Sequence, residues 1–226
     1  MKTMNKHFLL AGGFLLGLTG AASAALDVTA VNADWTVNTV IPAGNPVGIT
    51  AYQSFQGLPS GPIVDVSVDL DITGGYNGAL VGYLTLQDAN GNVATEFLLN
   101  QVGTSPSNPF GSAGAGFNIT LSDAGTVNGS IHGATGVPTG TWLPDSANTL
   151  DGTFGGLTAN GTWTLFLADV DAGTASPTLL SWGLNVVAVP EPRWGVTAAV
   201  GLLGLVGISL VNARRAGRRP VVRAVR

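Results

Sequence analysis

Carboxylates are the side chains of this chain that are best suited to chemistry. Asp169 and Asp171 flank one valine at the point where an apolar run gives way to a loop with glycine. Carboxylate oxygens and loop carbonyls are the ligands that a hard cation such as Ca²⁺ prefers. An Asx turn that starts the loop, in which an Asp side chain accepts a backbone N–H two residues on, explains the same pattern. Asp169 and Asp171 are therefore a candidate Ca²⁺ site, with Asp123 as a second candidate position.

A second carboxylate pair, Asp69 and Asp71, lies in an alternating run of apolar and polar residues. Residues two apart in a strand point to the same side, and we expect these carboxylates about 7 Å apart. Paired carboxylates hydrolyse glycosides only when one is desolvated enough to keep a proton. An outward strand face is solvated, so a hydrolase is the least favoured hypothesis.

The single histidine of residues 25–189 is His132, in a glycine-containing segment. A Ser-His-Asp system needs a nucleophile held beside the base, and no Gly-x-Ser-x-Gly turn is present. Zinc sites usually combine several His and Cys ligands, and the chain has no Cys. We therefore predict no catalytic residue and interpret His132 as a polar loop residue.

Charge is distributed very unevenly along the chain. Residues 25–189 contain 12 of the 13 acidic residues and none of the nine Lys and Arg residues. A segment without cations cannot neutralise phosphates, so nucleic-acid binding is excluded. Its carboxylates must be solvated, capped by backbone N–H groups or neutralised by a metal ion. Without Cys, no disulfide stabilises the segment.

The N-terminal segment 1–24 has the pattern of a secretory signal peptide. Lys2 and Lys6 precede an apolar run at 8–18, which is too short to span a bilayer. Ala22-Ser23-Ala24 supplies the small residues that signal peptidase requires, so we predict cleavage between Ala24 and Ala25. An uncleaved anchor is the alternative.

Residues 190–226 have the pattern of a membrane tail. Residues 194–213 carry no charge, and a helix of that length spans about 30 Å, the thickness of a hydrocarbon core. The basic segment 214–226 follows, and such a cluster stays in the cytoplasm. We predict a transmembrane helix with residues 25–189 outside; a buried core helix is the alternative.

This tail resembles the PEP-CTERM sorting signal. The family has a Pro-Glu-Pro motif, an apolar helix and an arginine cluster in this order at the C-terminus. The matching residues here are Pro190, Glu191 and Pro192, the span 194–213, and Arg214 and Arg215. The resemblance implies processing by an exosortase, a membrane transpeptidase of bacteria that export polysaccharide. The chain continues past Arg215 to Arg226, further than is usual in the family.

The segment between the two signals, 25–189, has a length that suits one all-β domain. Residues 64–72 alternate strictly, with the valines, leucine and isoleucine on one side, which predicts a half-buried strand. Asn90-Gly91 predicts a hairpin turn between strands at 80–86 and 93–99. Further strands are predicted at 117–121, 161–168 and 179–187. About eight short strands indicate an antiparallel β-sandwich of jelly-roll type.

Residues 41–187 also resemble the P domain, or Homo B, the β-sandwich that follows the catalytic domain of kexin- and furin-like serine endopeptidases. The resemblance rests on an Ile-Pro opening, an alternating strand, a Tyr-x-Gly-x-Leu turn and several Thr- and Trp-containing motifs. These lie at Ile41-Pro42, 63–73, 76–80, Asp123-Ala124, 139–144, 160–165 and 179–184. Ala79 departs from the family, which commonly has Asp there. The resemblance implies an accessory, non-enzymatic module, and the segment 25–189 leaves no room for a protease domain as well.

Three hypotheses follow for the exported domain. The first is a stand-alone P-domain-like module at the cell surface or in an extracellular polysaccharide matrix. The second is a carbohydrate-binding jelly roll, for which Trp35 and Trp142 are the candidate sugar-stacking residues. We expect Trp163 and Trp182 in the core, since large aromatics dominate cores. The third is a hydrolase. The implied partners are signal peptidase, exosortase, the membrane and extracellular polysaccharide.

Overall fold

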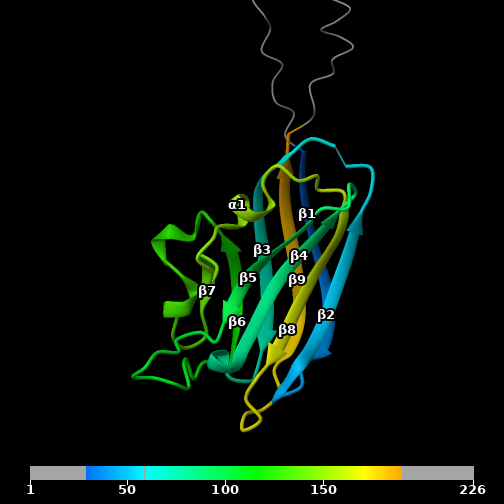
Figure 1. The fold of residues 1–226 in the computed structure, drawn as a ribbon. Coiled ribbons are helices and arrows are strands. Elements are labelled where there is room, and N and C mark those ends of the chain that lie inside the picture. The colour runs from blue at the N-terminus through cyan, green and yellow to red at the C-terminus, as the bar shows by residue number, and fades with distance from the viewer. Residues whose placement is uncertain (1–28, 59, 190–226) are drawn as a thin grey trace, which may run out of the picture.

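The computed structural model describes residues 29–58 and 60–189, which form two packed, mainly antiparallel sheets (Figure 1). Sheet A has the strand order β1-β9-β3-β6-β7, and sheet B has the order β2-β8-β4-β5. The strands are β1 (Thr29–Val40), β2 (Asn45–Phe55), β3 (Ile63–Thr73), β4 (Leu80–Asp88), β5 (Val93–Asn100), β6 (Gly116–Ser122), β7 (Thr139–Trp142), β8 (Gly161–Asp169) and β9 (Thr178–Ala188). Only the β6–β7 pair is parallel. The all-β sandwich predicted from the alternating segments is confirmed.

Helical structure in this part of the chain is short. It comprises α1 (Leu150–Phe154) and three single 3₁₀ turns, η1 (Asn77–Ala79), η2 (Gly125–Val127) and η3 (Ile131–Gly133). Helix α1 packs against β3 and β5. The hydroxyls of Thr153 in α1 and Ser146 in the preceding loop both donate to Glu96, a buried residue of β5. These bonds connect the helix to sheet B.

The alternation of inward and outward side chains along the strands explains which residues form the core. In β8, Trp163, Leu165 and Leu167 are buried while the residues between them face outward. Strand β9 places Trp182 and Leu184 in the same interior. Buried apolar side chains of both sheets form one cluster. Because every second residue of a strand points away from this core, each sheet also has an outer face, and the outer faces differ in chemistry.

The predicted strands and the 88–92 hairpin agree with β3, β4, β5, β6, β8 and β9, and Gly91 has a φ of 87° in the turn. The described residues contain nine strands. One residue of the predicted alternation was placed wrongly. Val64 is 45% exposed and Ile63 is buried, because the register of β3 against β9 shifts between Ile63 and Asp65. Such a bulge turns the next side chain to the other face.

Both ends of the described chain lie at one end of the sandwich. Thr29 at the start of β1 and Ile63 at the start of β3 pair with Ala188, the last residue of β9 (Figure 1). We call this the terminal end, and the opposite end, where β8 finishes at Asp169, the distal end. The predicted signal peptide and transmembrane helix lie outside the described residues. Within the described ranges, no helix has the length and apolar character needed to cross a membrane.

Candidate functional site

The carboxylates of Asp169 and Asp171 accept backbone donors of their own loop. Asp169, which is fully buried, accepts the amide of Asp171 at 2.9 Å and the hydroxyl of Thr174 at 3.4 Å. Asp171 accepts the amide of Gly173 at 2.8 Å. These are consecutive Asx turns, one of the two interpretations of the sequence pattern. These hydrogen bonds hold the distal loop together through its own backbone.

Asp123, the second candidate cation ligand, caps helix α1 from a distant part of the chain. Its two carboxylate oxygens accept the amides of Leu150 and Asp151 at 3.0 and 2.8 Å. First-turn N–H groups have no partner within a helix, so this carboxylate satisfies two of them. Asp151 in turn accepts the amide of Val66 in β3 at 2.9 Å. Burial, followed by repulsion from nearby Asp123 and Asp65, raises the pKa of Asp151.

Asp123 and the Asp169 loop are at opposite ends of the molecule. Asp123 follows Ser122, which pairs with Ser67 in the terminal half of β3, whereas Asp169 pairs with Leu80 at the distal start of β4. They cannot share one ion. Among the described residues, no cluster of three or more His, Cys, Asp or Glu side chains has a geometry suited to a metal ion. The calcium hypothesis stays a prediction.

His132 bridges two neighbouring loops through both ring nitrogens. Nδ1 lies 2.8 Å from the carboxylate of Asp145, and Nε2 lies 2.9 Å from the carbonyl oxygen of Thr104. A carbonyl and a carboxylate only accept, so this geometry favours the imidazolium, which carries a hydrogen on each nitrogen. The bond to Asp145, with that to Thr104, raises the pKa of His132. In this arrangement neither nitrogen has a lone pair available to act as a base.

The outer face of sheet A is acidic. Asp69 and Asp71 of β3 are half-buried and Asp34 of the edge strand β1 is exposed, and the three line one shallow hollow with polar neighbours. The hydroxyl of Thr120 donates to Asp69. The prediction that Asp69 and Asp71 share a face is confirmed, and the polar, open surroundings are unlike the desolvated site that a general acid requires.

The tryptophans proposed for sugar stacking are mostly engaged in packing. Trp163 and Trp182 are buried, as predicted. The Trp35 ring lies 4.8 Å from the Trp182 ring, centroid to centroid, and is partly buried against the core. Trp142 is also partly buried, and its indole donates to the carbonyl of Thr139. Trp35 and Trp142 are each only partly accessible, because each packs against the core.

Sequence reasoning missed a row of aromatic side chains on the outer face of sheet B. Phe166 of β8 pairs with Tyr83 of β4, which pairs with Phe97 of β5. The Tyr83 and Phe166 rings stack at 4.5 Å with 16° between their planes, and Tyr83 meets Phe97 edge-on at 6.1 Å. Tyr52 of the edge strand β2 stands diagonally next to Phe166 and is 70% exposed. We call these four residues the aromatic row.

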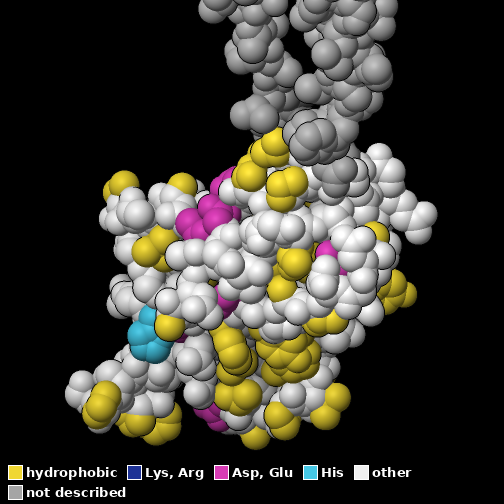
Figure 2. Space-filling view, turned by 45° about the horizontal axis from the view of Figure 1, so that its top comes forward, with side chains coloured by type: hydrophobic (Ala, Val, Ile, Leu, Met, Phe, Trp, Pro, Cys, Tyr) yellow, Lys and Arg dark blue, Asp and Glu magenta, His cyan; other side chains and the backbone are white. Residues whose placement is uncertain are grey.

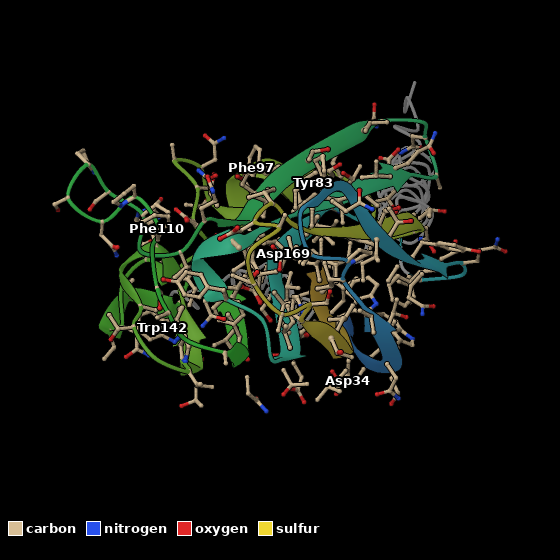
Figure 3. The ribbon with its side chains drawn as sticks, turned by 90° about the horizontal axis from the view of Figure 1, so that it is seen from below. Asp34, Tyr83, Phe97, Phe110, Trp142 and Asp169 are labelled. Carbon is tan, nitrogen blue, oxygen red and sulfur yellow. The ribbon has the colours of Figure 1, made fainter. Side chains whose placement is uncertain are left out.

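Hydroxyl side chains flank the aromatic row on the same outer face. Thr164 and Thr85 lie in the register row of Tyr52, and Thr85 shares a 2.8 Å hydrogen bond with Thr95 on β5. In the next row towards the terminal end, Ser54 and Thr162 hydrogen bond at 2.9 Å. This face therefore combines rings with hydroxyls. Figure 3 places Tyr83 and Phe97 on one side of the sandwich and Asp34 on the other.

The sorting residues Pro190, Glu191, Pro192, Arg214 and Arg215, and the cleavage pair Ala24 and Ala25, lie outside the described residues. Their roles stay predictions from the sequence.

Comparison with known proteins finds likeness in structure alone. No family model matches the chain, and no curated protein matches it. A serine protease of Aeromonas sobria in complex with its chaperone matches with a TM-score of 0.44 and 18% identity, over 73% of this chain and 27% of the protease chain. The serine protease of Aeromonas sobria without the chaperone matches with a TM-score of 0.41 and 18% identity, over 71% of this chain and 27% of the protease chain. The chain thus spans about a quarter of these proteins' length.

Proposed function

We propose that the protein is an exported, non-catalytic β-sandwich module, similar to a P domain, that is displayed at the cell surface or released into an extracellular polysaccharide matrix. The observation that carries the proposal is the pairing of Thr29 and Ala188 at the terminal end. A tail that leaves the domain there can tether it to a membrane while both outer sheet faces and the distal loops stay accessible.

The hydrogen bonds of the polar residues support a non-catalytic role. His132, the one imidazole in the described residues, has both nitrogens bonded to acceptors. The carboxylates of Asp123, Asp151 and Asp169 accept backbone amides that hold loops and α1 in place. A general acid or base needs a group free to exchange a proton with a substrate. These side chains instead stabilise the fold.

The tail motif supports the proposed route. Proline lacks a backbone N–H and disfavours a helical conformation in the residue before it, so we expect the Pro-Glu-Pro segment to be accessible to a processing enzyme. The uncharged span that follows inserts into the membrane, and the arginines fix its direction. We propose that signal peptidase removes residues 1–24 and that an exosortase acts at the PEP-CTERM-like tail.

Intact-mass measurement and fractionation in the native host test this proposal. With the exosortase gene present, the recovered protein should lack residues 1–24 and most of the segment after Pro192. In a strain without exosortase, it should keep the tail and remain in the membrane fraction. A Glu191→Ala variant should behave like the deletion, and an Asp171→Asn variant should be processed normally. Equal mass and location in both strains would make the tail a simple anchor.

An activity assay tests the non-catalytic part separately. The purified protein should cleave peptide and ester substrates no faster than buffer. Turnover that disappears in His132→Ala but remains in the folded control Trp142→Phe would contradict this part of the proposal.

A further inference from the structure

We propose that the outer face of sheet B is a binding site for neutral polysaccharide, with Tyr52 and Phe97 as its most accessible contact residues. The inference rests on the proposed extracellular location, and it names the ligand class that such a module would hold. It uses a different site from the Trp35 and Trp142 pair suggested by the sequence.

The aromatic row is exposed and ordered by its own contacts. Tyr52 is 70% exposed and Phe97 48% exposed, on the two edge strands of sheet B. Between them, the stacked Tyr83 and Phe166 rings fix the middle of the row. Neighbouring strands are about 4.8 Å apart, so a row across four strands extends about 14 Å. Figure 2 shows hydrophobic side chains gathered over the lower part of the face on which β4 and β8 lie.

The distribution of charge on the outer face of sheet B favours a neutral ligand. Sheet B strands carry acidic residues only at Asp88, Glu96 and Asp169, and all three side chains are buried. The outer positions of these strands are aromatic, aliphatic, Thr, Ser, Asn or Gln. The described residues contain no Lys or Arg, so an anionic glycan would find neither of these cations to pair with on this face and would meet the repulsion of an acidic domain.

The mixture of rings and hydroxyls fits a sugar better than a wholly apolar partner. A pyranose presents polarised C–H groups from its ring face, which are attracted to the negative face of an aromatic ring. Its hydroxyls need hydrogen-bond partners nearby, and Thr85, Thr95 and Thr164 provide them one register row away. Sites of this kind combine apolar contact area with a few polar groups that fix orientation. A second copy of the chain is the competing occupant, because exposed apolar patches also mark protein interfaces.

Affinity electrophoresis and isothermal titration calorimetry test the inference on the full chain in a zwitterionic, sugar-free detergent. The probes are dextran, mixed-linkage β-glucan and galactomannan as neutral polymers, and alginate as the anionic one. We expect wild type to bind at least one neutral polymer and not alginate. Tyr52→Ala with Phe97→Ala should weaken that binding at least tenfold. The matched control is Phe110→Ala, since Phe110 is a 71% exposed aromatic in the loop between β5 and β6; this change should leave binding as in wild type.

Several results would overturn the inference. They are no binding to any neutral polymer, binding that the double variant leaves unchanged, equal loss in Phe110→Ala, or stronger binding to alginate. Sedimentation velocity tests the competing occupant. A concentration-dependent dimer that the double variant abolishes would show that this face binds a second copy of the chain. These measurements use purified protein, so their outcome is independent of the sorting experiment, and either proposal can fail alone. Thermal unfolding of the double variant near the wild-type temperature confirms that the fold is intact.

Discussion

Nδ1 of His132 lies 2.8 Å from a carboxylate oxygen of Asp145, and Asp145 also accepts the amide of Asn100 at 3.2 Å. The pair therefore connects the loop that follows β7 to η3 and to the end of β5. It is the one salt bridge among the described residues.

This pair predicts a stability difference that depends on pH. The folded-state pKa of His132 is raised above its usual 6.5, mainly by the bond to Asp145. A histidine whose pKa is raised by folding contributes to the free energy of unfolding. This contribution is fully present below pH 6.5 and is lost as the pH rises through the folded-state pKa. The His132 side chain is 38% exposed, so solvent screens the pair. We therefore expect His132→Gln to lower the free energy of unfolding by about 0.5–1 kcal/mol at pH 5.5, and by clearly less at pH 9. Urea unfolding at both values measures this.

Asp145→Asn is the matched control, because it keeps the shape of the acceptor but removes the charge. It should reduce the pH dependence in the same way. An NMR titration of the His132 ring that gave a pKa at or below 6.5 would contradict the proposed ion pair.

Trp163→Ala should destabilise the domain severely. The side chain is fully buried, its ring lies 5.1 Å from the Phe154 ring, and its indole donates to the carbonyl of Ala159. Removing a buried aromatic of this size costs about 3–5 kcal/mol. Trp142→Ala, at a half-buried position, should cost much less. Thermal unfolding compares the two variants, and a melting temperature for Trp163→Ala within a degree or two of wild type would show that the site is not core.

Strand positions were predictable because they depend on local alternation. Residues 64–72 alternate over a long run, and Asn90-Gly91 accepts the positive φ of a tight turn, so β3 and the β4–β5 hairpin could be located. The edge strands β1 and β2 were missed although a signal was present. Residues 31–38 alternate between apolar and polar side chains, and burial alternates along 33–40 and 49–55, where the inner residues are only partly buried. Strand β7 has four residues, too few to show a period.

The aromatic row could not be located from the sequence because it depends on register between strands. Phe97, Tyr83 and Phe166 come from three strands, and each is the one aromatic residue on the outer face of its strand. What brings them into one row is the pairing of β5, β4 and β8. A signal existed in β4, where Tyr83, Thr85 and Gln87 alternate with buried residues, but a shift of one residue in any strand would separate the rings.

Asp123→Ala should destabilise the α1 region. Its carboxylate accepts the amides of Leu150 and Asp151, and no local residue provides a substitute for both. Loss of a helix cap costs about 0.5–2 kcal/mol. Asp123→Asn, which keeps one oxygen acceptor, should cost less. Chemical denaturation gives the free energies, and hydrogen exchange should show faster exchange at Leu150 and Asp151 in the alanine variant. Equal exchange in the variant and wild type would contradict the capping role.

Asp151→Asn should stabilise the fold slightly. The raised pKa of Asp151 means that its ionised form is disfavoured in the folded state, by burial and then by Asp123 and Asp65. An amide oxygen still accepts from Val66 while the charge is removed. The gain should be well under about 1 kcal/mol because of solvent screening. It should be largest at neutral pH and vanish as the pH falls towards 3.8, the unfolded value, where Asp151 is protonated in wild type. A variant less stable than wild type at pH 7 contradicts this.

The loop that contains Asp169 and Asp171 is the candidate site for a stabilising effect of calcium. Residues 25–189 have 12 carboxylates and no Lys or Arg, so the self-repulsion of this segment opposes folding and any salt should relieve part of it. A cation that binds only the folded state adds about 2.7 kcal/mol at a hundredfold excess over its dissociation constant. We therefore expect millimolar CaCl₂ to raise the melting temperature more than NaCl of equal ionic strength.

Two variants separate calcium binding from the turn-forming role of these carboxylates. The double change Asp169→Asn and Asp171→Asn keeps an oxygen acceptor for each Asx turn, so it should remove the calcium-specific rise and leave the response to NaCl. Asp169→Ala leaves the Asp171 amide without its partner, so it should destabilise the loop in calcium-free buffer as well. Equal effects of CaCl₂ and NaCl on wild type would mean that these carboxylates serve only the Asx turns of the distal loop.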